Sequence, residues 1–121
     1  MRPVAEARGL SANERAVLDR ILRGASFAGA SALADQIDRA TVVGGIPTLL
    51  DLEVDGSAPV SMAADGPIPV QALVEGTDGA IEGMLMIWVE GGYLSALEFA
   101  WVTDEIPPGM PAAESILVAS A

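Results

Sequence analysis

The fold of this chain is decided by Ile81-Glu82-Gly83-Met84-Leu85-Met86-Ile87-Trp88-Val89-Glu90-Gly91-Gly92-Tyr93-Leu94-Ser95-Ala96-Leu97-Glu98-Phe99-Ala100-Trp101-Val102. Two β-prone runs are separated here by a pair of glycines. Such a pair is typical of a tight hairpin, because the favoured two-residue turns need positive φ at their central positions. We therefore predict a long β-hairpin over residues 80–103.

The expected pairing of the two strands follows from a turn at Gly91-Gly92. It places Trp88 opposite Ser95 and Met86 opposite Leu97. Because side chains alternate across a strand, one face should then carry aromatic and methionine side chains. The other face should be aliphatic, with Glu98 as its one charge. A hairpin that is apolar on both faces normally lies in the middle of its sheet and is covered twice, by helices, a second layer or a partner.

Helical patterns precede the hairpin. Ser11 and Glu14 fit a capping box, and an apolar stripe follows at helical spacing as far as a C-terminal Gly24. A second helix is expected over about residues 28–39. Residues 1–10 are expected to form a loose arm.

The period then changes from 3.6 to 2. Short strands are expected at residues 41–43, 48–55 and 68–75, with Gly44-Gly45 in a turn. The tail over residues 112–121 is expected either to dock as a last short strand or to stay mobile. This order predicts one α+β domain over residues 1–121, with two N-terminal helices packed on one face of a four- to five-stranded, mostly antiparallel sheet.

Charge is distributed unevenly along the 121 residues. The net formal charge is −11, and all six basic residues are arginines within the first 39 positions. This balance argues against binding of nucleic acid or of an anionic membrane, since both need cationic patches. No apolar run is long enough to span a bilayer, and no signal peptide is evident, so a cytoplasmic location is expected.

Catalytic and metal chemistry find little support. The chain has no cysteine and no histidine, which removes disulfides, the usual nucleophilic triads and the preferred zinc ligands. The run Asp51–Gly56 superficially resembles the start of a calcium loop, but Met62 stands where the loop requires glutamate. We interpret that run as a solvated strand edge, and we predict no catalytic residue, metal or cofactor.

Glu98 and the aromatic side chains of the hairpin are the candidate functional residues. A carboxylate among aliphatic side chains should be paired, protonated or near the rim of the sheet. Its partner would be either an arginine of the helical layer (Arg15, Arg20, Arg23 or Arg39) or a ligand or protein partner, with acid–base work as a further alternative. Trp88, Tyr93, Phe99 and Trp101 would form either ordinary core or an exposed patch that anchors a partner or a homodimer.

The stretch Leu-Glu-x-x-Trp-x-x-Asp-Glu-x-Pro, from Leu97 to Pro107, resembles a family of small acidic actinobacterial proteins of unknown function. The likeness continues in the helix over residues 14–22 and in Pro47–Val54. Relatives in that family often carry cysteines before the position of Pro47, where this chain has Gly44-Gly45-Ile46. The resemblance implies a small stand-alone bacterial domain and no activity.

These patterns favour a non-enzymatic binding module of the immunity or adaptor type, whose acidic sheet surface and residues 104–111 bind a basic protein. The expected contact residues are Trp88, Tyr93, Glu98, Trp101, Asp104 and Glu105. The alternative is a small-molecule-binding protein or hydrolase that uses Glu98 in an aromatic-lined pocket. A homodimer through the aromatic face is a third possibility.

Overall fold

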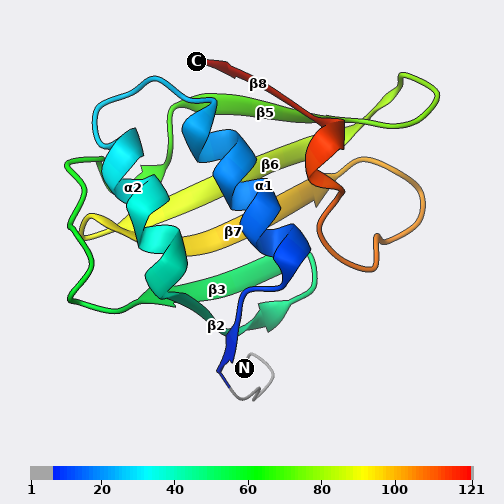
Figure 1. Ribbon diagram of the computed structural model, residues 1–121. Coiled ribbons are helices and arrows are strands. Elements are labelled where there is room, and N and C mark those ends of the chain that lie inside the picture. The colour runs from blue at the N-terminus through cyan, green and yellow to red at the C-terminus, as the bar shows by residue number, and fades with distance from the viewer. Residues whose placement is uncertain (1–6, 121) are drawn as a thin grey trace.

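The predicted hairpin forms the centre of the sheet. In the computed structural model, which describes residues 7–120, β6 (Ile81–Glu90) and β7 (Tyr93–Trp101) pair antiparallel around two turn glycines. Gly91 and Gly92 have φ of 60° and 83°, as a primed turn requires. The strand order β1-β2-β3-β7-β6-β5-β8 places this pair in the middle (Figure 1). The central position of the hairpin is therefore confirmed.

The sheet is larger than expected. It has eight strands within the described residues, so the prediction of four to five strands is wrong. The α+β class, with two helices and an antiparallel sheet, is confirmed. The other six strands are β1 (Arg8–Gly9), β2 (Ala40–Ile46), β3 (Leu49–Val54), β4 (Gly66–Pro67), β5 (Val70–Glu75) and β8 (Ile116–Ser120), and every pairing is antiparallel.

The additional strands come from segments with no alternating pattern. β1 and β4 have two residues each, too few for a period of 2 to be visible. β1 lies in the segment expected as a loose arm, whose first six residues are outside the described part of the chain. The segment expected as a tail forms a 3₁₀ turn, η2 (Ala113–Ser115), and then β8, which pairs with β5 at the edge of the sheet.

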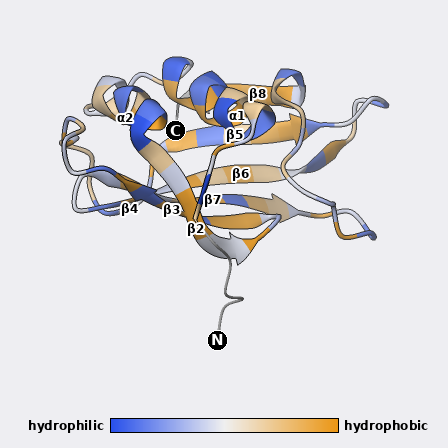
Figure 2. Cartoon of the chain, turned by 60° about the horizontal axis from the view of Figure 1, so that its bottom comes forward, coloured by the Kyte–Doolittle hydropathy of each residue, from blue (hydrophilic) through white to orange (hydrophobic). Residues whose placement is uncertain are grey.

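Both helices cover the same face of the sheet (Figure 2). α1 (Ala12–Arg23) begins at the predicted capping box: the Ser11 hydroxyl accepts from the Glu14 N–H at 3.0 Å, and Glu14 Oε1 accepts from the Ser11 N–H at 2.8 Å. α2 (Ala30–Gln36) continues into a 3₁₀ turn, η1 (Ile37–Arg39). No helix in the described part of the chain combines the length and the apolarity that crossing a bilayer requires.

The core lies between the helices and the sheet. Its largest fully buried aliphatic side chains come from both layers, so burial of apolar surface holds the layers together. They are Leu18, Ile21, Leu22, Leu33, Leu85, Ile87, Leu94, Leu97 and Ile116.

The glycine pair at residues 44–45 lies within β2 and does not form the predicted turn. The chain turns two residues later, at Pro47 and Thr48. Gly45 has φ of 102°, and a Cβ built on it would lie 2.1 Å from the Leu49 carbonyl oxygen. Gly45 therefore allows a close approach between two strands, next to a bulge at Val43.

Candidate functional site

A β-bulge at Ser95 decides which side chains of β7 face the helices. Trp88 pairs with Ala96, whereas the next residue of β6, Val89, pairs with Leu94. Ser95 is thus one extra residue in β7, and the expected pairing of Trp88 with Ser95 is wrong. The bulge shifts the register by one residue. Every residue of β7 after Ser95 therefore lies on the face of the sheet opposite to the face predicted for a regular hairpin.

The physical reason for the bulge is the spacing of the leucines in β7. Leu94 and Leu97 are three positions apart, so a regular strand would place them on opposite faces. With the bulge both point into the core and are 1% and 0% exposed. This spacing is the signal from which the bulge could have been predicted.

Glu98 consequently lies on the face of the sheet away from the helices, together with Trp88. Trp88 Nε1–H donates to Glu98 Oε1 at 3.1 Å. The direct cross-strand neighbours of Glu98 are Leu49 on β3 and Met86 on β6. The carboxylate is therefore partly buried among apolar side chains at the centre of this face.

The predicted salt bridge between Glu98 and a helical arginine is wrong. The four candidate arginines lie on the other side of the sheet and are engaged there. Arg15 pairs with Asp38, Arg23 with Asp19, Arg39 with Ser57 and Asp55, and Arg20 donates to the Ile116 carbonyl oxygen.

The four aromatic side chains of the hairpin do not share one face, contrary to the expected register. Phe99 is 5% exposed in the core, and Trp101 packs against that core. Trp88 and Tyr93 are half-buried and belong to the opposite face, where Tyr93 lies across from Glu90 at the turn. Of the predicted contact residues, the structure therefore brings Trp88 and Glu98 together and places Trp101 on the other side.

The face without helices is called the outer face below. No described element covers it (Figure 2). Its middle is a continuous apolar area that crosses five strands, with Met84 and Leu49 each 37% and Leu117 47% exposed. The residues of this area are Leu49, Leu73, Met84, Met86, Trp88, Ala96, Ala100 and Leu117, which lie opposite one another or opposite Glu98 on adjacent strands.

The charged side chains that the structure describes on the outer face are all acidic. Glu98 lies inside the apolar area, and the others lie around it at Asp51, Glu53, Glu75, Glu82 and Glu90. The five described arginines lie on the helix side of the sheet or at its β1 edge, so none of them lies on the outer face.

A small hollow lies beside Glu98. It has a volume of about 210 Å³ and is lined by Ile46, Leu49 and Ala100, with contributions from Thr48, Phe99 and Trp101. This volume is below the roughly 300–1,000 Å³ of typical small-molecule sites. The hollow fits one side chain better than a substrate.

Asp104 and Glu105 belong to a different depression. They are exposed in the loop after β7 and line a cleft of about 590 Å³ together with Glu82 and the prolines of residues 107–111. The cleft contains three carboxylates and no basic side chain among its lining residues. Phe99 of the core and Met110, which packs against the core, also line it, so the cleft lies at the end of the hairpin beside the core.

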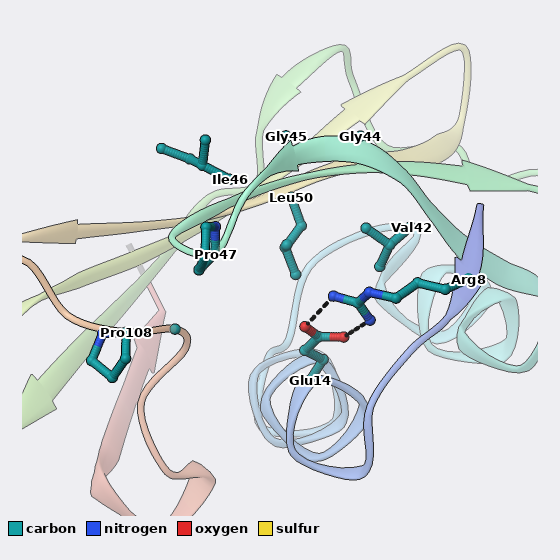
Figure 3. A pocket seen from close by; sticks show the side chains of 10 residues that line it. Arg8, Glu14, Val42, Gly44, Gly45, Ile46, Pro47, Leu50 and Pro108 are labelled. Carbon is teal, nitrogen blue, oxygen red and sulfur yellow. Dashed lines mark hydrogen bonds and ion pairs between the residues drawn. The ribbon is translucent and has the colours of Figure 1, made fainter. Parts of the chain in front are cut away.

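A third cavity, of about 410 Å³, contains a close ion pair (Figure 3). Arg8 donates Nη1–H to Glu14 Oε1 at 2.8 Å and Nη2–H to Oε2 at 2.9 Å. Val42 and Leu50 point toward this pair from the sheet. The hydrogen bonds from Arg8 hold the pKa of Glu14 below its ordinary value. Because Glu14 also caps α1, the pair fastens β1 to that helix, and we assign it a structural role.

A buried amide, which the sequence patterns did not single out, holds the hairpin turn in place. Gln36 is fully buried; its Nε2 donates to the Pro59 and Gly92 carbonyl oxygens at 2.8 Å each, and its Oε1 accepts from the Leu94 N–H at 2.9 Å. The only signal in the sequence was its position next to the apolar stripe of α2. Gln36 therefore joins α2, the turn and the preceding loop.

Within residues 7–120, no three acidic side chains are grouped so that they could hold a metal ion. Comparisons of the chain with protein-family models, with curated proteins and with solved structures found no significant match.

Proposed function

We propose that this chain is a protein-binding module that takes a basic partner on its outer face. The observation that carries the proposal is the composition of that face: an apolar area that no element of residues 7–120 covers, with one carboxylate inside it and acidic side chains as its described charged neighbours. Exposed apolar areas with polar rims mark interaction sites. Because the described charged side chains around the apolar area are all acidic, the face favours a partner of positive charge.

A second copy of the chain fits this face poorly. A two-fold contact centred on Glu98 would place Glu98 against its own copy, and like charges across an interface are costly. A partner that carries lysine or arginine among apolar residues has the complementary pattern. The cleft at Asp104 and Glu105 adds attraction at longer range.

The small-molecule alternative has less support. Glu98 lies on an open sheet face, and the hollow beside it is small for a substrate. We therefore favour a binding function over hydrolysis.

The test uses synthetic peptides and nuclear magnetic resonance of the ¹⁵N-labelled chain. A peptide that alternates leucine and lysine should shift the amide signals of β6 and β7 on the outer face, whereas a leucine–glutamate peptide should not. Affinity should fall as salt rises, because exposed charges are screened. Binding that is insensitive to salt, or shifts confined to α1 and α2, would contradict the proposal.

A pair of variants with the same change in charge completes the test. Met84→Lys places a cation in the apolar area of the outer face, and Ser31→Lys places one on exposed α2. Met84→Lys should abolish peptide binding, and Ser31→Lys should leave it within about twofold of the wild type. Equal loss in both variants would show that net charge alone governs the binding.

A further inference from the structure

We infer that Glu98 and Trp88 together form a binding site for a guanidinium group, so that the partner inserts an arginine at the centre of the outer face. This inference rests on the proposed function and specifies the side chain that the face recognises. It follows from the surroundings of one carboxylate.

Glu98 is partly buried, and no arginine of residues 7–120 forms an ion pair with it. Leu49 and Met86 flank it across the two neighbouring strands, and Ala96 and Ala100 flank it along β7. Trp88 Nε1–H satisfies Oε1, but Oε2 has no hydrogen-bond partner among residues 7–120. A carboxylate in such apolar surroundings attracts a cation more strongly than one at an exposed rim, because water screens the interaction less.

The indole of Trp88 favours a guanidinium over an ammonium. It is held beside the carboxylate by its own N–H, and its direct cross-strand neighbours, Pro67 and Ala96, are small. A planar guanidinium can donate to a carboxylate at its edge and stack on an aromatic ring with its face. An ammonium group is more strongly hydrated and loses more on entering an apolar area.

The hollow beside Glu98 has room for a second side chain of the partner, next to the inserted arginine. It lies on the far side of the carboxylate from Trp88 and has apolar walls at Ile46, Leu49 and Ala100. An aliphatic side chain next to the arginine would fill it. The recognised chemistry is thus an arginine with an apolar neighbour.

The experiment compares two peptides of equal length and charge, one alternating leucine with arginine and one alternating leucine with lysine. The indole N–H signal of Trp88, assigned with Trp88→Phe, reports on the site, and titration gives each dissociation constant. The arginine peptide should bind on the order of tenfold more tightly. It should also move the Trp88 indole signal further.

Glu98→Gln should remove the preference for arginine, whereas Glu53→Gln should weaken both peptides equally and keep the preference. Glu53 is the matched control because it is exposed on the same face, on β3. If Glu98→Gln perturbs the amide spectrum of the whole chain, Trp88→Leu tests the same site by removing the stacking surface.

The outcomes separate this inference from the proposed function. Equal affinity for both peptides on the outer face would overturn the guanidinium site and leave the binding module standing. A preference that survives Glu98→Gln would also overturn it. Absence of outer-face shifts with either peptide would overturn both.

Discussion

Trp88 and Glu98 lie ten positions apart in the sequence and share a hydrogen bond of 3.1 Å on the outer face. Their meeting depends on Ser95, the extra residue of β7. In a regular hairpin Glu98 would point toward the helices and Trp88 away from them. One bulged residue therefore both completes the core and creates the candidate site.

Deletion of Ser95 should destabilise the chain severely. Without the extra residue, β7 must turn either Leu94 or both Leu97 and Phe99 away from the core. Removing a buried leucine from the core alone costs about 2–5 kcal/mol. Urea unfolding should show a loss of at least about 3 kcal/mol or no folded state. Ser95→Ala keeps the bulge and should stay within about 0.5 kcal/mol of the wild type; a similar loss in both variants would show that the hydroxyl matters and the bulge does not.

Glu98→Leu should leave the free energy of unfolding unchanged or raise it by up to about 1 kcal/mol. A partly desolvated carboxylate is replaced by a side chain that suits its apolar neighbours, Leu49 and Met86. Peptide binding should be lost at the same time. A residue that lowers stability yet is required for binding is typical of functional sites. Urea unfolding together with titration of the leucine–arginine peptide checks both parts, and a clear loss of stability would indicate that Glu98 has a structural role.

Gln36→Ala should cost about 3 kcal/mol. The substitution leaves the Gly92 carbonyl oxygen and the Leu94 N–H without their buried partner, and each unsatisfied group costs about 1–3 kcal/mol. Asp35→Ala, at the exposed neighbouring position of α2, is the matched control and should change stability by less than about 0.5 kcal/mol. Hydrogen exchange at residues 91–94 should accelerate in Gln36→Ala alone. Unchanged exchange there would contradict the role of Gln36 in holding the turn.

Acidification should release β1 from α1. The Arg8 guanidinium lowers the pKa of Glu14 in the folded chain, so this carboxylate stabilises the fold above its ordinary pKa. That contribution declines as the pH falls below the ordinary value of about 4.5 and is lost once the pH passes the lowered pKa. The protection factors of Gly9 and Leu10, which compare hydrogen exchange with the intrinsic amide rate at the same pH, should fall over this interval.

Glu14→Gln should show the same low protection factors at neutral pH and should lower the free energy of unfolding by about 1 kcal/mol. The loss is modest because the Arg8 side chain is half-exposed. In Glu14→Gln the protection factors of Gly9 and Leu10 should no longer change between pH 6 and pH 3. A Glu14→Gln variant that still shows the acid-induced change would assign that change to another carboxylate.

Patterns confined to one element were readable from the sequence. Two examples are the capping box at Ser11 and Glu14 and the glycine turn at residues 91–92. Each depends only on a few residues that are close in the sequence. A local pattern gave the wrong prediction at Gly44 and Gly45, which lie within β2 and not in a turn; Gly45 permits the close approach of the next strand. Strands of two residues, such as β1, have no local pattern and form because a neighbouring strand offers them hydrogen bonds.

The sequence by itself determined the α+β class, the central hairpin and the one-sided charge, because turn geometry, β-propensity and composition do not depend on distant contacts. Only the tertiary structure decided which face receives Glu98, which aromatic side chains are core and where Gln36 bonds. The physical reason is that a bulge is placed by the need to bury Leu94 and Leu97 together under the helices, and a shift of one residue then reverses the face of the side chains beyond it.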